Sequence, residues 1–453
     1  MLELPIFILP ILVNFQHLFS KPVFEHIKLL IIGAIACPKQ RTIAAILRVL
    51  GLSQDKKYSN YYYALNRAKW SSLKVSLVLF SLLIKLVPKG MPLEIVMDET
   101  EERRKGSKIK WLGCYRDAIR STKTKKVFSF GLRWLCFSLL ISLPWSQRKW
   151  ALPFLIILIP PKKALKSSKN LADQNIRRKS IMKYAAQAIK LIRRFVGVKR
   201  KIKVMADGAF CCFEVCHVCK ETNIAFICRM RWDACLYDFP PVKKGRGRPR
   251  KKGKIIAKLN QKLKTPDKYW KKGFVIWYGG IRKKVLYLTG TCIWYRSGYP
   301  AIPIRWVILK DPNKEFESCA LFSTMRSLKA LSIAQSFIER WNIEVTFEEA
   351  HAHLGFGTQR GWADKTIERT TPAILGLFSI TCLIAKEILK STKQPLPIVK
   401  TAWYNKTTAT FSDVLLLVRQ HLLRFIFFTR STFSPEREKN PAIEIIDLLL
   451  ECG

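Results

Sequence analysis

The stretch Ile181–Asp207, IMKYAAQAIKLIRRFVGVKRKIKVMAD, carries the pattern that decides the fold class. From Ile181 to Ile192, apolar residues recur at the i, i+3, i+4 spacing that places them on one buried helix face. A short alternating strand, Ile202–Ala206, follows and ends at Asp207. A helix that runs directly into a strand favours an α/β sheet.

Strand-like runs on both sides of this stretch extend the pattern. Leu93–Met97, Val127–Leu132 and Leu152–Ile159 are short apolar runs that predict strands. Ala225–Leu309 is rich in Tyr, Val, Ile and Trp without clear helices between the strands, whereas Leu328–Leu354 has the spacing of one long helix. We therefore expect an α/β core that is split by a strand-rich insertion.

Helical patterns at both ends divide the chain further. Residues 1–90 are expected to form a helical N-terminal DNA-binding region, because Arg41–Trp70 pairs an apolar helix with a polar turn and a second, Tyr-rich helix. That pattern is compatible with a helix-turn-helix DNA reader and equally with an ordinary helical hairpin. The remaining parts are the first part of the core at 91–224, the insertion at 225–325, a core helix at 326–365 and a helical C-terminal region at 366–453. In the last part, Ala373–Ala385 is apolar enough for a packing surface or a dimer contact.

The basic composition predicts a polyanionic partner. The 453 residues hold 80 Lys and Arg against 32 Asp and Glu, for a formal net charge of +48. Hydrophobic residues make up 49% of the chain and charged residues 25%, which excludes a disordered protein. No apolar run reaches the roughly 20 residues of a membrane-spanning helix, so nucleic acid is favoured over a membrane. Thirteen cysteines, an odd number in a long chain, indicate reduced thiols and a cytoplasmic protein.

The segment Lys243–Lys254, KKGRGRPRKKGK, has Lys or Arg at eight of its twelve positions and cannot build a core. At its centre, Arg246, Arg248 and Arg250 alternate with Gly247 and Pro249 and resemble an AT-hook, with Lys251 next to them. The residue before a proline is pushed towards an extended backbone, and the narrow minor groove of A·T-rich DNA attracts arginine. A basic loop that contacts only phosphates is the alternative.

Three carboxylates stand out in this chain, which is otherwise rich in cations: two follow predicted strands and one lies on a predicted helix. Asp98 follows one predicted strand and Asp207 another, and the ends of strands in an α/β sheet are where such folds place ligands. Glu344 shares one helical face with Arg340, Glu348 and His351. Three converging carboxylates suit two divalent metal ions in a phosphoryl displacement, and Mg²⁺ or Mn²⁺ prefers such oxygen ligands. Taken singly, each acid is better explained by a structural role: a turn cap for Asp98 or Asp207, and an i, i+4 helix ion pair with Arg340 for Glu344.

The cysteines in Cys211–Cys219, CCFEVCHVC, include one pair at zinc-ligand spacing. The segment directly follows Asp207 and has the pattern of a core helix, in which free cysteines act as small buried hydrophobic residues. We expect the second role.

The order of these features resembles the DDE transposases of bacterial insertion sequences. An Asp after a strand, an Asp-Gly after a second strand, a strand-rich insertion and a helix with R-W-x-I-E follow one another as they do in that family. The branch it most resembles has a Y-x2-R-x3-E-x6-K signature, which Arg340 and Glu344 match, whereas Phe337 replaces the Tyr and His351 replaces the Lys. The similarity runs from about residue 40 to about residue 390.

This resemblance implies a ribonuclease H-like catalytic core in which Asp98, Asp207 and Glu344 hold Mg²⁺ or Mn²⁺. It implies an endonuclease that cuts the transposon ends and then joins the freed 3′-OH to target DNA, as a homodimer on paired ends of double-stranded DNA. Arg340 and His351 would contact DNA phosphates. The rival interpretation is a non-catalytic DNA-binding protein, either a decayed transposase or an architectural protein.

Overall fold

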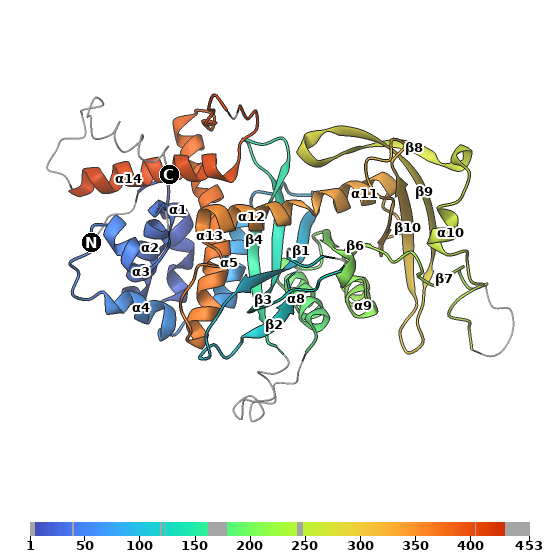
Figure 1. The fold of residues 1–453 in the computed structure, drawn as a ribbon, viewed down its shortest axis with the longest axis horizontal. Coiled ribbons are helices and arrows are strands. Elements are labelled where there is room, and N and C mark those ends of the chain that lie inside the picture. The colour runs from blue at the N-terminus through green and yellow to red at the C-terminus, as the bar shows by residue number, and fades with distance from the viewer. Residues whose placement is uncertain are drawn as a thin grey trace.

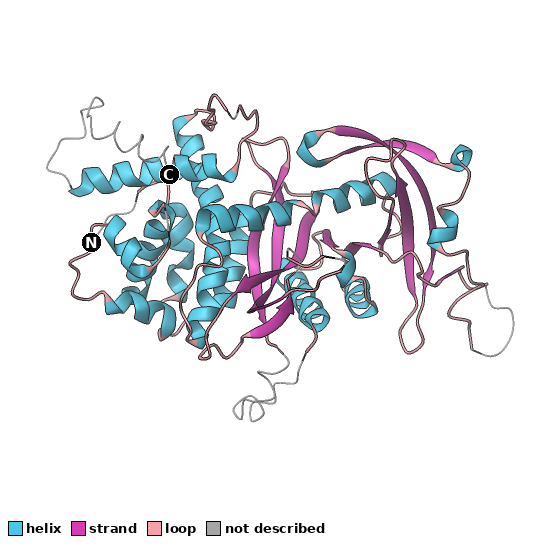
Figure 2. Ribbon diagram, viewed as in Figure 1, coloured by secondary structure: helices cyan, strands magenta, loops and turns pink. Residues whose placement is uncertain are grey.

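A computed structural model describes residues 5–38, 40–117, 120–122, 124–161, 179–241, 248–403 and 405–430 of the chain. Helices and strands alternate around one mixed sheet of 11 strands, which confirms the α/β class (Figures 1 and 2). A helical region lies at one end of the molecule and a strand-rich region at the other, with the centre of the sheet between them (Figure 1).

The residues before the first strand are helical, as predicted. The elements are α1 (Leu9–Leu12), the 3₁₀ helix η1 (Val13–Leu18), α2 (Lys21–Ala36), α3 (Ile43–Val49), α4 (Ser59–Asn66) and α5 (Ser72–Ile84). Thr42 caps the N-terminus of α3 by accepting a hydrogen bond from the backbone N–H of Ala45 (3.1 Å). On α4, Tyr61 is buried whereas Tyr62 and Tyr63 are about half exposed. The structure therefore contains the predicted pair of helices, while a role in reading DNA stays a prediction.

Five strands form the centre of the sheet in the order β4–β3–β1–β5–β6. They are β1 (Leu93–Arg103), β3 (Phe128–Ser142), β4 (Lys149–Ile159), β5 (Ile202–Ala206) and β6 (Ala225–Arg229). The pairs β4–β3 and β3–β1 are antiparallel, whereas β1–β5 and β5–β6 are parallel. The crossover from β4 to β5 includes α8 (Ile181–Val196), and α9 (Phe213–Glu221) connects β5 to β6.

The strand-rich part of the chain continues this same sheet. β11 (Cys319–Ser323) pairs with β6, β10 (Ile302–Lys310) with β11, and β9 (Arg282–Trp294) with β10, all antiparallel. β7 (Leu236–Tyr237) and β8 (Lys271–Ile276) both pair with β9, and β2 (Gly113–Arg116) pairs with β3. Short helical turns join these strands: α10 (Leu259–Lys262), η3 (Asp267–Tyr269) and η4 (Tyr278–Gly280). A further turn, η2 (Gly208–Phe210), lies between β5 and α9. The domain boundaries given above stay predictions.

The predicted long helix from Leu328 to Leu354 is wrong in one respect, because it consists of two helices. These are α11 (Ala330–Glu339) and α12 (Asn342–Leu354). Around Arg340 and Trp341 the backbone hydrogen bonds tighten to the i, i+3 pattern, as in Glu344 N–H to Trp341 O (3.0 Å). The side chain of Asn342 also takes up a carbonyl that the first helix leaves free, that of Glu339 (2.9 Å).

The C-terminal helices are α13 (Asp364–Thr392) and α14 (Phe411–Arg430). In α13, Leu375–Ala385 is buried throughout, so the apolar stretch predicted there is a packing surface within the chain. By length and composition alone α13 could cross a membrane, a possibility that the search for uninterrupted apolar runs missed. However, 67% of its most apolar window is buried inside the structure, as in the core helix of a globular protein.

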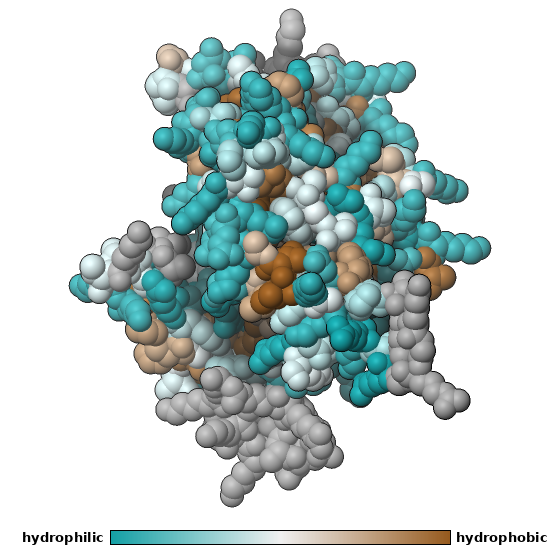
Figure 3. Space-filling view, turned by 90° about the vertical axis from the view of Figure 1, so that its right-hand side faces the viewer, coloured by the Kyte–Doolittle hydropathy of each residue, from teal (hydrophilic) through white to brown (hydrophobic). Residues whose placement is uncertain are grey.

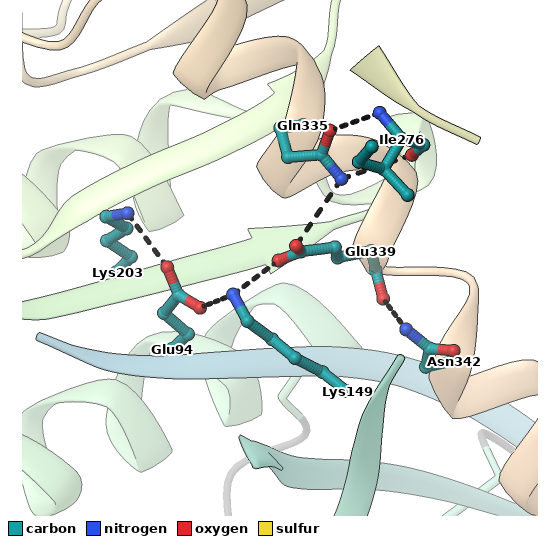
Figure 4. A network of polar contacts seen from close by, with 7 residues as sticks. All are labelled: Glu94, Lys149, Lys203, Ile276, Gln335, Glu339 and Asn342. Carbon is teal, nitrogen blue, oxygen red and sulfur yellow. Dashed lines mark hydrogen bonds and ion pairs between the residues drawn. The ribbon is translucent and has the colours of Figure 1, made fainter. Parts of the chain in front are cut away.

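Partly buried ionic groups tie the helices to the sheet. Glu94 of β1 pairs with Lys203 of β5 (2.8 Å) and with Lys149 of β4, and Lys149 also reaches Glu339 of α11 (2.8 Å) (Figure 4). Gln335 of α11 extends this network to the backbone of β8 (Figure 4). Buried charges persist in proteins when they are paired and hydrogen-bonded in this way.

A second network surrounds Glu102, whose side chain is completely buried. Its carboxylate accepts hydrogen bonds from Arg104 (2.8 Å), from the indole N–H of Trp134 on β3 (3.0 Å) and from Thr371 on α13 (2.7 Å). One carboxylate thus joins the edge of β1 to the neighbouring strand and to the long C-terminal helix.

The substitution Glu102→Ala should lower the free energy of unfolding by about 3–5 kcal/mol, because it leaves a buried guanidinium and a buried indole without their acceptor. Denaturant unfolding followed by circular dichroism measures this. Glu317→Ala, at an exposed loop position, is the matched control and should change the stability by less than about 0.5 kcal/mol. Equal stability of the two variants would contradict the structural role of Glu102.

Candidate active site

Parallel pairing of β1 with β5 brings two of the predicted acids to the same level of the sheet. Met97 lies opposite Ala206, so Asp98 and Asp207 each follow directly after a paired residue. Asp207 comes after the end of β5, as predicted, and precedes η2. Asp98 does not end its strand, because antiparallel pairing with β3 continues β1 as far as Arg103.

The third acid reaches the site from α12. Glu344 lies in the first turn of this helix, four residues after Arg340. A single guanidinium nitrogen, Nη1 of Arg340, lies 2.9 Å from Oδ2 of Asp98 and 2.9 Å from Oε1 of Glu344. The two carboxylate oxygens therefore lie within two hydrogen-bond lengths of each other, although 242 and more residues of chain separate Asp98 from Arg340 and Glu344.

The charges of the three acids act on one another. Burial raises the pKa of Asp98 to about 7; Arg340 and the Glu99 N–H oppose this rise, and the charges of Glu344 and Asp207 add to it. Burial also raises the pKa of Glu344, against the opposing effect of Arg340 and with a further rise from Asp207 and Glu348. A carboxylate with a strongly raised pKa beside other acids, as Asp98 is here, is typical of functional centres.

The chemistry of these donors fits a hard divalent cation. Three carboxylates supply the oxygen ligands that Mg²⁺ and Mn²⁺ prefer, and a cation near them would offset the repulsion that adds to the raised pKa values of Asp98 and Glu344. In the part of the chain that the structure describes, no group of three His, Cys, Asp or Glu side chains is arranged tightly enough to hold a metal ion. In the structure the positive charge between Asp98 and Glu344 is instead the guanidinium of Arg340.

The neighbouring acids on α12 have other surroundings. Glu348 is exposed, and Glu349 pairs with Nε2 of His353 (3.3 Å). Only Glu344 shares a cation with Asp98 among these three, so the geometry favours it as the third member of the site.

His351 points its ring towards the backbone that follows α12. Its Nδ1 lies 2.8 Å from the carbonyl oxygen of Phe356, and because a carbonyl only accepts, Nδ1 carries the hydrogen. Partial burial lowers the pKa of His351, so the neutral ring presents Nε2 as an acceptor. The predicted contact between His351 and a DNA phosphate would require protonation of this ring, and it stays a prediction.

The basic linker is anchored at its C-terminal end. Arg246 lies outside the described residues, whereas Arg248, Arg250 and Lys251 are exposed. Lys252 then places its ammonium group 3.8 Å from the ring centre of Tyr237 and 4.9 Å from that of Tyr295. Backbone hydrogen bonds join Gly253 and Lys254 to Asp238, next to β7. The exposed arginines therefore project from a fixed base at the edge of the sheet.

Sequence reasoning missed an aromatic pair beside Glu344. Tyr278, in η4 between β8 and β9, packs against Trp341 with 5.5 Å between ring centres, and both side chains are about 40% exposed. The charges of Arg340 and Glu344 influence the pKa of Tyr278, which burial raises, so its hydroxyl lies near the acids. The only signal in the sequence was the Gly-Gly turn at 279–280, where both residues have positive φ.

The cysteine cluster belongs to the core. Cys216 and Cys219 are fully buried on α9, and Cys228 of β6 donates its thiol hydrogen to the carbonyl of Asp207 (3.0 Å). Burial raises the pKa values of all three thiols, which opposes metal binding because a thiolate is the ligand form. The helical, hydrophobic role expected for this segment is confirmed.

Comparison with known proteins bears on this site. A family model described as "DDE superfamily endonuclease" matches residues 14–284, which include Asp98 and Asp207 and end before Glu344. A curated relative, the "Probable transposase for insertion sequence element IS701" of Microchaete diplosiphon, is 28% identical over 89 residues. That alignment covers 20% of the chain and 22% of the relative, so the chain matches only about a fifth of the relative's length.

The pKa of Asp98 predicts how stability depends on pH in metal-free buffer with EDTA. Its pKa is higher in the folded than in the unfolded chain, so between about pH 4 and pH 7 the folded state holds the extra proton and stability falls as pH rises. Each unit of pKa shift corresponds to about 1.4 kcal/mol. Denaturant unfolding between pH 5 and pH 7.5 should show this loss in the wild type and a shallower loss in Asp98→Asn. If the stability of the wild type and of Asp98→Asn fell in parallel with pH, the pKa of Asp98 would not be raised by folding.

Proposed function

We propose that the chain, which belongs to the DDE superfamily endonuclease family, is the transposase of an insertion sequence. It would cut the ends of the element and join the freed 3′-OH groups to target DNA. The observation that supports this proposal most directly is the meeting of Asp98 and Glu344 on Arg340, with Asp207 close enough to raise the pKa of both acids.

We infer that the centre of the sheet is a ribonuclease H-like core. Its support is the strand order β4–β3–β1–β5–β6, with three antiparallel strands followed by two that run parallel to β1. In this arrangement the acids lie on the central strand, just after its parallel neighbour, and on a helix that covers one face. On this proposal the strands beyond β6 are an elaboration of the core.

In this core Asp98, Asp207 and Glu344 would hold Mg²⁺ or Mn²⁺. A pair of such ions, when bound, stabilises the attacking and the leaving oxygen of an in-line phosphoryl displacement. Arg340 would hold the two carboxylates at a fixed separation and balance their charge. Because it is largely buried and already between the acids, its proposed contact with a DNA phosphate would require the guanidinium to turn away from one of them.

Double-stranded DNA is the proposed partner, both as transposon end and as target. The net charge of +48 supplies the sequence-independent attraction. The end of the molecule that carries β7 to β10 is mostly hydrophilic, with small apolar patches (Figure 3), and the exposed Lys271, Lys272 and Lys284 lie on β8 and β9. The proposed setting is the cytoplasm, with two copies of the chain on paired ends.

The second candidate is a DNA-binding protein without catalysis. The observation that favours it is the ion pairing of Arg340, which satisfies two of the acids without any metal ion. Cleavage by the wild type separates the two candidates, because only the first needs a divalent cation.

Cleavage should be measured on a DNA fragment that carries both ends of the element encoding the chain, in Mg²⁺ and in Mn²⁺. Asp98→Asn, Asp207→Asn and Glu344→Gln should each reduce the rate by about 1,000-fold or more, which corresponds to about 4 kcal/mol of transition-state stabilisation. Glu348→Gln, an exposed acid one helical turn after Glu344, is the matched control and should cleave at nearly the wild-type rate.

Binding of the same DNA in EDTA should be retained by all four variants, which shows that they are folded. If Asp98→Asn cleaved DNA at the wild-type rate, the assignment of the site would be refuted. Binding by the wild type without cleavage under any metal condition would favour the non-catalytic candidate.

Arg248→Ala should weaken binding to A·T-rich duplex by about fivefold or more and binding to G·C-rich duplex much less, because a narrow minor groove attracts an inserted arginine. Fluorescence anisotropy at fixed salt concentration measures both affinities. Lys89→Ala, an exposed cation far from the linker in sequence, should weaken both by a similar small factor. An equal loss on both duplexes for Arg248→Ala would leave only phosphate contacts for the linker.

A further inference from the structure

A large apolar cavity, partly open to solvent, lies between the N-terminal helices and α13. It measures about 580 Å³ and is lined mainly by α2, α3, α5 and α13 together with the loop 358–363. Sites that bind drug-sized ligands have about 300–1,000 Å³, so the cavity has room for several aliphatic side chains. It is separate from the acids of the candidate active site, none of which lines it.

The lining is mostly apolar, and its charged side chains are all basic. Side chains such as Phe15, Phe19, Phe24, Ile27 and Leu377 form the interior. Among the described residues that line the cavity, the charged ones are Arg41, Arg360 and Arg369, and none is an acid. This chemistry suits an apolar occupant that carries negative charge and does not suit duplex DNA, whose surface is polar.

One polar side chain in the lining has no partner. Both amide atoms of Gln359, Nε2 and Oε1, are buried and make no hydrogen bond within the described part of the protein. A buried donor and acceptor left unpaired cost free energy, so an occupant that satisfies both is favoured.

Gln335, elsewhere in the chain, shows which groups a glutamine amide can bind. Gln335 accepts a hydrogen bond from the backbone N–H of Ile276 (2.8 Å) and donates one to the carbonyl of the same residue (3.1 Å) (Figure 4). A peptide segment offers this pair of groups, whereas a hydrocarbon chain offers neither.

We propose that the cavity is the docking site of the chain's own C-terminal segment, Pro441–Leu450, with sequence PAIEIIDLLL. Seven of these ten residues are Ala, Ile or Leu. Glu444 and Asp447 are acidic, as is the adjacent Glu451, and residues 440–453 contain no Lys or Arg, so the segment is negatively charged within a strongly basic chain. Its apolar side chains match the interior of the cavity, and its acids match the exposed Arg360, whereas Arg41 and Arg369 already donate hydrogen bonds to backbone carbonyls.

The last described helix contacts α2, whose residues line the cavity, and Arg430 lies eleven helical residues, or roughly 17 Å, beyond that contact. This helix, α14, packs against α2, where Arg419 donates hydrogen bonds to the carbonyls of Ile35 (2.9 Å) and Cys37 (3.0 Å). Residues of α2 from Phe24 to Ala34 line the cavity. The 23 residues that follow Arg430 are long enough to return to it, since ten extended residues span roughly 33 Å.

Docking would connect the C-terminal segment to the candidate active site. Gln359 lies five residues after Leu354, the last residue of α12, which carries Glu344. A segment that pairs with Gln359 would therefore fix the loop behind this helix.

Hydrogen–deuterium exchange of the full-length chain tests the proposal. The amides of residues 442–450 should exchange at least about tenfold more slowly than an unstructured peptide of the same sequence. Ala373→Trp, at an exposed position that lines the cavity, should abolish this protection by filling the site. Ala352→Trp, at an exposed alanine on α12 outside the cavity, should leave it unchanged.

A second variant acts on the occupant, so that damage to the cavity cannot explain the result. Ile446→Asp should release the segment and leave the thermal unfolding of the remaining protein nearly unchanged. Unprotected amides in the wild type, or protection that Ala373→Trp does not alter, would overturn the proposal. Protection that grows with protein concentration would also overturn it, because a second copy would then supply the segment.

Discussion

The parallel pairing of β1 with β5 is the constraint on which the candidate active site depends. The register that sets Met97 opposite Ala206 brings Asp98 and Asp207 to one level of the sheet. The alternation of a strand then decides the face: Leu93, Ile95 and Met97 enter the core on one side, whereas Val96 packs with residues of α11 and α12 on the other. Asp98 has the parity of Val96 and so faces the helices that carry Arg340 and Glu344.

Acidic residues are few in this strongly basic chain, and several of them form ion pairs with Lys or Arg in or near the core. Glu94 pairs with Lys149 and Lys203, and Glu102 with Arg104. Asp98 differs because burial raises its pKa despite the contact with Arg340, and the charges of Glu344 and Asp207 add to that rise. The pairs of Glu94 and Glu102 hold elements of the fold together. Asp98 and Glu344 share one guanidinium, so together they keep a net negative charge that a divalent cation would balance.

Local patterns predicted the parts of the fold that depend on neighbouring residues. The helix before β5, the position of Asp207 and the helical cysteine segment follow from spacing alone, and the structure has them. The length of β1 did not follow, because pairing with β3 extends it through six charged or polar residues, Asp98–Arg103, that have no strand pattern of their own. The division at Arg340 and the contact of Tyr278 with Trp341 also depend on distant parts of the chain, which a single sequence does not reveal.

The choice of the third acid shows how sequence and geometry contribute differently. The family model matches residues 14–284 and ends before α12, so it bears on Asp98 and Asp207 and leaves Glu344 to be argued from this chain alone. Spacing from Arg340 favours Glu344 over its neighbours, but the same spacing also describes a simple i, i+4 ion pair on a helix surface. The break between α11 and α12 separates these alternatives. It places Arg340 between the helices, where its guanidinium is buried and contacts β1 as well as Glu344, and a surface ion pair would have neither the burial nor the second carboxylate.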